Sequence, residues 1–241
     1  MLVWSAEPDG IRFGAGGAFQ LESSRDEFGV RSHGVTERLA GGETRLYPLP
    51  QSDFETYAKL RPKDAALNPL IATANHYDRQ KAIGPHQVEG GRLWFGNRFY
   101  DGEGDRGVGA FGYFDTAMRQ YRLFSTAEVA PYEIRAMLVE PDCVWVALDH
   151  FGEDISRFPG ELVRWDRKTQ VAQRYSVEFV VTEISREGES LRLTTGGGYA
   201  LLTGVTLRRF RTQTIAGGRT ATTPIDRFPP PPSRVTVSTV H

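Results

Sequence analysis

The feature that most constrains the fold of this chain is a short pattern that occurs four times. Each copy begins with an acidic turn that contains glycine or proline, and continues into a strand whose alternate residues are apolar. Alternation of this kind indicates a strand packed between two layers. Internal repetition is typical of solenoids and propellers. The copies are EPDGIRFGA (7–15), VEGGRLWFG (88–96), EPDCVWVAL (140–148) and REGESLRLTT (186–195).

Each copy lies within a group of short apolar segments that predicts four strands. One segment, such as 134–139, precedes the turn, so the turn closes a hairpin. Two more follow the repeat, as at 161–166 and 171–177. The apolar triads that start at Leu93, Val144 and Leu191 are 51 and 47 positions apart. Four strands joined as a meander with this period predict the blades of a β-propeller.

The predicted fold is therefore all-β: a β-propeller of about four or five four-stranded blades with one partly helical insert. We place the blades at about 1–50, 82–126, 132–178 and 179–214, and the insert at 51–81. Residues 215–241 form a Pro-rich tail whose end is a candidate closing strand. The ring closes with four blades, gains a fifth, or belongs to a larger ring. A β-sandwich competes, but does not explain the repeated order.

The repeat resembles the blades of the streptogramin-lyase-like and two-component-regulator propeller families. Their blades have an Asp-Gly turn before a Leu-Trp-type strand and an Arg-Xaa-Asp strand after it. The resemblance covers about residues 2–214 and implies the propeller architecture, which enzymes and binding domains share. Its lyase branch implies Mg²⁺ and a histidine base, but the catalytic residues of that branch do not align onto this chain.

Charge and hydropathy argue against two classes of partner. The chain has 29 Lys and Arg against 30 Asp and Glu, a formal charge of -1, so no global field attracts nucleic acid or an anionic membrane. No apolar stretch approaches membrane-spanning length, and the N-terminus lacks a signal-peptide pattern. We expect a cytoplasmic protein as written, or an exported one if the chain is processed or truncated. Met1 is also compatible with an internal start in a longer protein.

Three residues within the predicted strands are expected to serve packing. Cys143 is the one cysteine, which excludes an internal disulfide, and it lies in an apolar run. A reactive thiol needs exposed electropositive surroundings, so Cys143 is expected to be a small buried hydrophobe. Trp94 and Trp145 lie in the middle of strands and are expected to pack between blades.

The long connections are predicted to share one face of the disc. With alternating strand directions, the first and third turns of each blade lie on one face and are short. The other connections are long: 16–33, 97–110, 149–159 and 51–82. Clustered loops of this length usually carry function, so this face is the predicted working surface. The insert, with helical turns interrupted by Pro62 and Pro69, is a candidate lid.

A candidate metal site lies in the second long loop. Asp101, Glu103 and Asp105 alternate there with glycines. Ca²⁺ or Mg²⁺ would take several oxygen ligands from such a flexible loop, although the bidentate Glu of the helix-loop-helix calcium site is missing. An ordinary solvated turn is the alternative.

His150 and His33 are the candidate catalytic residues, because both border long loops. A general base needs an imidazole with a pKa near neutral, and Asp149 or Glu153 would orient His150. Hydrogen-bonded loop histidines are the alternative. Arg31, Arg98, Arg106 and Arg157 are candidates for binding a carboxylate or phosphate, with loop-bracing ion pairs as their alternative role.

The leading hypothesis is a binding module that recognises a small polar or anionic ligand, or a partner segment, at the face with the long loops. The second is a metal-assisted lyase or hydrolase at the same face. The third is a protein-interaction scaffold, since propellers are rigid discs with broad surfaces. The sequence leaves open whether the chain is an enzyme.

Overall fold

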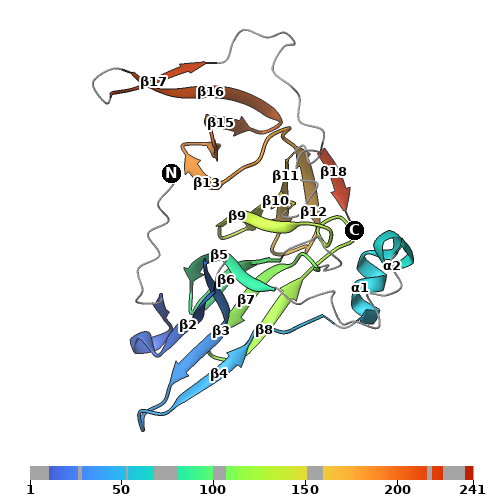
Figure 1. Ribbon diagram of the computed structural model, residues 1–241. Helices are drawn as coiled ribbons and strands as arrows, with labels where there is room; N and C mark the ends of the chain where they lie inside the picture. Colours follow the sequence, from blue (N-terminus) through green and yellow to red (C-terminus); the bar gives the residue numbers. More distant parts are fainter. Residues whose placement is uncertain are drawn as a thin grey trace. The chain divides into compact units, whose positions relative to one another are not determined.

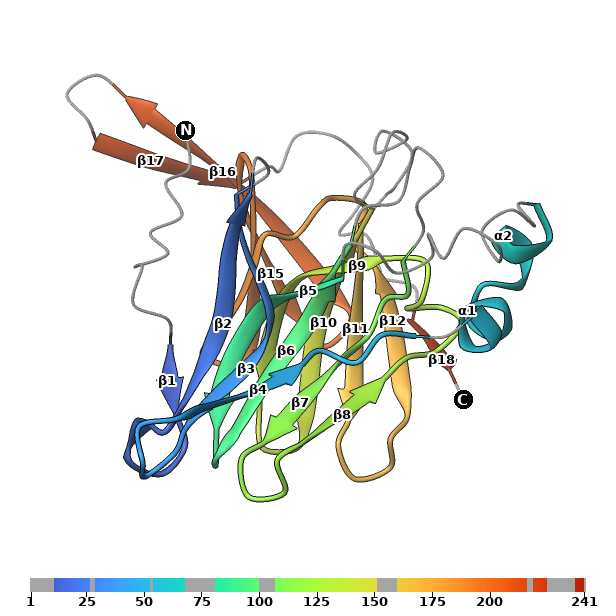
Figure 2. The same ribbon diagram turned by 60° about the horizontal axis from the view of Figure 1, so that its bottom comes forward.

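The computed structural model describes residues 11–26, 29–52, 54–67, 81–99, 107–150, 160–215, 219–224 and 237–240. These residues form antiparallel sheets with two short α-helices, so the chain is all-β, as predicted. It divides into two compact units, Met1–Pro131 and Tyr132–His241, which we call unit 1 and unit 2 and describe separately (Figures 1 and 2). No helix in the described part has the length and apolar character needed to cross a membrane.

Unit 1 contains one sheet of eight strands where the sequence predicts two four-stranded sheets. The ladder passes from the first group to the second through a single pair, Ser32 with Ile83. The order is β1-β2-β3-β5-β6-β7-β8, with β4 paired to β3. The strands are β1 (Arg12–Phe13), β2 (Phe19–Asp26), β3 (Gly29–Arg38), β4 (Thr44–Pro48), β5 (Ala82–Glu89), β6 (Arg92–Arg98), β7 (Phe111–Asp115) and β8 (Gln120–Phe124).

The sheet of unit 1 folds over on itself around an aromatic core. Phe13 and Phe19, at the first edge of the sheet, have ring centroids 6.5 and 5.7 Å from that of Phe114 on β7. Strands so distant in the sheet order make contact only if the two halves of the sheet face each other. The buried core is Phe13, Phe19, Leu21, Val35, Leu49, Ile83, Leu93, Phe95 and Phe114. The halves therefore pack like two layers although one ladder joins them.

The prediction of a long loop at 16–33 is wrong, because most of this segment forms two strands. Only a short 3-10 turn, Ala15–Gly17, precedes β2, and β2 pairs with β3 as a hairpin. Phe19, Leu21 and Val35 alternate with polar residues and point into the core, which is the pattern of a half-buried strand. The segment contains many polar residues and glycines, so its sequence favours a loop over a strand.

The predicted insert is partly helical, as expected. α1 (Phe54–Leu60) ends just before Pro62, and α2 (Pro62–Leu67) starts at that proline, which favours the first helical position. Tyr57 on α1 packs against Val108 and Ala130. The buried guanidinium of Arg61 donates to the Gly107 carbonyl at 2.8 Å, so the helices are fixed to the end of the second long loop. Pro69 lies outside the described residues, and the lid stays a prediction.

Unit 2 contains two five-stranded sheets. Each holds one predicted four-stranded meander and one strand from the tail: β18 pairs with β12, and β17 pairs with β16. The candidate closing strand is therefore an edge strand. The sheets are β9 (Glu133–Val139), β10 (Cys143–Asp149), β11 (Glu161–Asp166) and β12 (Ala172–Ser176) with β18 (Val237–Val240), and β13 (Glu183–Glu187), β14 (Ser190–Thr195), β15 (Gly198–Thr203) and β16 (Thr206–Ile215) with β17 (Arg219–Pro224).

The repeat seen in the sequence is also a repeat of contacts. A carboxylate in the hairpin turn accepts a hydrogen bond from the side chain five residues later, in the middle of the triad. The three described instances are Glu89 with Trp94 (3.2 Å), Glu140 with Trp145 (3.1 Å) and Glu187 with Arg192 (3.1 Å). The middle residue also pairs across each hairpin with the residue seven positions before it. Three hairpins therefore share one register.

A second recurring contact closes the next hairpin in two of these meanders. Asp115 Oδ1 accepts the backbone N–H groups of Ala117 and Met118, and Asp166 Oδ1 accepts those of Lys168 and Thr169, all within 3.1 Å. Each turn then places its fifth residue in the left-handed region, with φ of 54° at Arg119 and 59° at Gln170. An Asp that accepts these bonds stabilises a tight turn.

We predict that Gly112→Ala destabilises unit 1 by about 1–3 kcal/mol, the usual cost of overpacking. A Cβ at Gly112 on β7 would overlap the backbone carbonyl of Arg122 on β8, so the hairpin would have to open. The measurement is the urea unfolding midpoint. Gly41→Ala is the control, because a Cβ there meets nothing within 4 Å. Equal midpoints for the two variants would contradict this packing.

Candidate functional site

Five of the predicted site residues lie outside the described residues. They are the candidate metal ligands Asp101, Glu103 and Asp105 and the candidate ligand-binding residues Arg106 and Arg157. Their roles therefore remain predictions. Glu153, named as a partner of His150, also lies outside the described part.

In unit 1, three predicted site residues lie on strands rather than on loops. His33 and Arg31 belong to β3, where His33 is exposed and Arg31 half-buried. Arg98 is the last residue of β6, and its side chain lies against Gly84 on β5. Arg31 and Arg98 thus come from the two strands that flank β5. The expectation of a loop position for His33 and Arg31 is wrong because 29–38 is a strand.

His150 follows β10 in unit 2, at the end of the sheet where a long connection begins. Its backbone N–H donates to Asp149 Oδ1 at 2.9 Å. Asp149 pairs in register with Glu133 on β9, whose side chain is 1% exposed. Arg135 lies 3.7 Å from Glu133 Oε1 and 3.8 Å from Asp149 Oδ2. Among the described residues, the carboxylates of Glu133 and Asp149 and the guanidinium of Arg135 thus lie at the end of the sheet where His150 follows β10.

A groove lies elsewhere in unit 2, at the end with the short turns. It has a volume of about 220 Å³ and opens between the two sheets of the unit. This position differs from the predicted working face. Its lining residues combine aromatic, apolar and polar groups: Trp145, Arg164, Gln173, Tyr175, Arg186, Glu189, Leu191, Leu202 and Gly204.

Strand register explains why the groove forms there. Ala147, Leu162 and Tyr175 form one row across β10, β11 and β12, deep in the core between the sheets. Two residues nearer the short turns, the same face carries the row Trp145, Arg164 and Gln173. A guanidinium and an amide cannot pack into an apolar core without partners. The sheets therefore close over the first row and open at the second.

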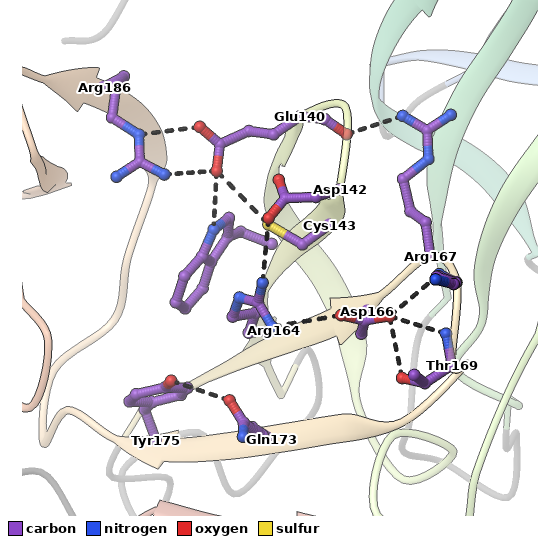
Figure 3. Close-up of polar contacts among 12 residues, drawn as sticks. Glu140, Asp142, Cys143, Arg164, Asp166, Arg167, Thr169, Gln173, Tyr175 and Arg186 are labelled. Carbon is purple, nitrogen blue, oxygen red and sulfur yellow. Dashed lines mark hydrogen bonds and ion pairs between the residues drawn. The ribbon is translucent and has the colours of Figure 1, made fainter.

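The wall of the groove is an ion pair that joins the two sheets. Arg186 on β13 donates from Nε to Glu140 Oε1 at 2.8 Å and from Nη2 to Oε2 at 2.5 Å (Figure 3). Glu140 Oε2 also accepts from Trp145 Nε1 at 3.1 Å. The hydrogen bonds from Arg186 hold the pKa of Glu140 below its ordinary value, so this carboxylate is charged at neutral pH.

Glu140, Asp142 and Cys143 place their ligand atoms within 4.8 Å of one another, but they do not fit a metal. Cys143 is buried, as predicted, and burial raises the pKa of its thiol to about 12. The thiol therefore keeps its proton and donates to Glu140 Oε2 at 3.5 Å. The Glu140 oxygens are taken by donors, and Ca²⁺ and Mg²⁺ prefer oxygen ligands over thiols. This cluster braces the fold.

Polar contacts also fix the other side of the groove. Arg164 Nη2 donates to Asp142 at 3.3 Å, and its Nη1 lies 3.9 Å from Asp166. The Tyr175 hydroxyl donates to Gln173 Oε1 at 3.3 Å (Figure 3). Because this oxygen accepts from Tyr175, the amide N–H groups of Gln173 are the part of that side chain suited to a ligand.

Arg164, Gln173 and Arg186 were not among the predicted site residues. The signal that indicates Arg164 and Gln173 is the register of the repeat. Trp145, the middle residue of its triad, pairs with Arg164 on β11, and Arg164 pairs with Gln173 on β12. In unit 1 the positions 51 residues earlier carry Trp94, Tyr113 and Arg122. Trp145 is buried between the sheets, which confirms its predicted packing role, and Trp94 is buried in unit 1.

The sequence matches no model of a known protein family. It also matches no curated protein sequence.

We predict that Glu140→Gln lowers the stability of the protein at neutral pH by about 1 kcal/mol, a value discounted for the partly exposed Arg186. The folded-state pKa of Glu140 is depressed below its ordinary 4.5. Its contribution is therefore present above that value and is lost as pH falls through the folded-state pKa.

The measurement is the free energy of unfolding against pH for the wild type and Glu140→Gln. The two curves should converge in acid. Glu189→Gln is the control, because Glu189 is an exposed groove residue whose backbone, not its carboxylate, contacts Arg186. A constant difference at every pH would contradict the assigned role.

Proposed function

We propose that this chain is a propeller-type binding protein that holds a small polar ligand or a partner segment in the groove of unit 2. The blade interpretation is supported by the turn carboxylate that contacts the residue five positions later in three hairpins. It is also supported by the period of 51 residues between Trp94 and Trp145. Such a repeat carries architecture, so the function rests on the groove.

The composition of the groove carries the functional proposal. Trp145, Tyr175, Leu191 and Leu202 supply apolar surface, and Gln173 and Arg164 supply hydrogen-bond donors. Binding pockets combine an apolar lining with a few placed polar groups in this way. The guanidinium of Arg164 already contacts the Asp142 carboxylate, and that of Arg186 contacts the Glu140 carboxylate. This neutralisation favours an uncharged polar ligand over a strongly anionic one.

Recognition fits these groups better than catalysis does. A nucleophile or general base needs a pKa suited to proton transfer near neutral pH. Here the thiol of Cys143 keeps its proton because burial raises its pKa to about 12, and Glu140 is bound by Arg186. Apart from the Glu189 carboxylate, the charged and amide side chains that line the groove are donors of hydrogen bonds, which serve to orient a ligand.

We predict that a panel of sugars, amino-acid amides and short peptides contains a compound that raises the Tm of the wild type saturably, because a ligand of the folded state stabilises it. Gln173→Ala and Arg164→Gln should each weaken that binding by about tenfold, the effect of one lost hydrogen bond. The measurements are thermal melts and titration of tryptophan fluorescence.

Gln120→Ala is the control for this experiment, because Gln120 is exposed on β8 and does not line the groove of unit 2. An unchanged affinity in Gln173→Ala and Arg164→Gln would contradict the groove as the binding site. Binding of a folded protein through a broad surface, with no effect of either variant, would support the scaffold hypothesis instead.

A second candidate function is a metal-assisted lyase or hydrolase at the end of unit 2 with the long connections. The observation that favours it is the buried Glu133 beside Asp149, Arg135 and His150. A carboxylate and a histidine at one place are the groups that a proton-transfer reaction uses. The predicted metal site of Asp101, Glu103 and Asp105, which belongs to unit 1, is the alternative location of this activity.

For that candidate we predict a saturable rise in Tm when Ca²⁺ or Mg²⁺ is added to the chelated protein, lost in Asp101→Asn. Glu133→Gln removes the charge of the buried carboxylate and so tests its role in the reaction separately from that of the metal ligands. A melt that neither ion moves would contradict the metal-assisted reaction, and so would a shift that survives in Asp101→Asn.

A further inference from the structure

Unit 1 has a groove of its own, with a volume of about 450 Å³, on the outer face of its first strands. Register sets its layout. Arg12, Gln20 and Thr36 lie side by side across β1, β2 and β3. Arg38 lies two residues beyond Thr36, where its backbone N–H donates to the Ala18 carbonyl at 2.8 Å. Glu22 lies two residues beyond Gln20 in the opposite direction along the strands.

The arginines of this groove differ from two other arginines of unit 1, Arg92 and Arg119, which are ion-paired. The guanidiniums of Arg12 and Arg38 make no hydrogen bond or ion pair with any described residue, and both are exposed. In contrast, Arg119 pairs with Glu37 at 2.9 Å, and Arg92 pairs with Asp115 at 3.0 Å. Toward one end of the groove there are therefore two cations that no carboxylate of the described residues contacts.

Glycines keep that end open. Gly16 and Gly17 form the turn before β2 with φ of 63° and 68°, a conformation that other residues rarely adopt. A Cβ at Gly16 would meet nothing within 4 Å, and one at Gly17 would lie 3.7 Å from the Cβ of Arg12. The turn thus passes along the base of the Arg12 side chain and adds no side chain above the groove.

We propose that this groove binds an oxyanion, a carboxylate or a phosphate, between Arg12 and Arg38. Guanidinium groups match both anions because they donate two parallel hydrogen bonds. Gln20 and Thr36 lie between the two arginines and supply further polar contacts. Glu22, at the other end, favours a ligand that carries hydrogen-bond donors away from its anionic group. The site does not depend on the groove of unit 2.

The test is titration of the full chain with inorganic phosphate and, separately, with citrate, at constant ionic strength. Calorimetry and the Tm serve as readouts. We expect saturable binding of at least one anion in the wild type. Arg12→Gln and Arg38→Gln should each weaken it by about tenfold or more, since a charge-assisted hydrogen bond is lost. Binding of phosphate alone indicates a phosphate ligand, and binding of citrate alone a carboxylate ligand.

Two further variants separate a site from a general charge effect. Arg45→Gln removes the same charge from the same hairpin, but Arg45 lies opposite Glu37 in the register of β3 and β4, on the other face of the sheet, and does not line the groove, so binding should persist. Glu22→Gln removes a repelling charge and should strengthen binding of the bare anions. Absence of saturable binding, equal loss in Arg45→Gln, or retention in both Arg12→Gln and Arg38→Gln would overturn the proposal.

Discussion

The interaction on which this architecture depends is the hydrogen bond between a turn carboxylate and the side chain five residues later. Glu140 with Trp145 is the example with an additional partner, because the Glu140 carboxylate also accepts hydrogen bonds from Arg186 on the second sheet of unit 2. One side chain thus fixes the register of its own hairpin and joins two sheets. The hydrogen bonds from Arg186 hold its pKa low, so the contact persists as a charged one at neutral pH.

The groove of unit 2 follows from that arrangement. The ion pair holds the sheets at their turn end, while apolar rows such as Ala147, Leu162 and Tyr175 hold them in the middle. Between these two regions Trp145 is buried, but the polar heads of Arg164 and Gln173 in the same row cannot pack into an apolar core. A small opening with mixed chemistry is the result. The groove lies at the short turns, whereas the sequence predicts a working surface at the long loops.

In unit 1 a carboxylate also links two parts of the structure through hydrogen bonds. Glu37 accepts hydrogen bonds from Arg119 and from Tyr47. The bonds from Arg119 join the two halves of the unit 1 sheet, as Glu140 joins the two sheets of unit 2. The charge of Arg119 is compensated in this way. Arg12 and Arg38 lie on the opposite face of the first strands, where the described residues offer them no carboxylate in contact. The distribution of ion pairs therefore decides which arginines are suited to an anion.

The sequence by itself determined the strand meanders, the short turns, the buried Cys143 and the shared hairpin register, because these depend on local alternation and on a repeated spacing. Only the tertiary structure decided that 19–38 is a hairpin, that the first two strand groups share one ladder through Ser32 and Ile83, and that the tail adds edge strands. It also decided which charges meet. Glu140 and Arg186 are 46 residues apart, and no local pattern encodes a contact that exists only when two sheets pack.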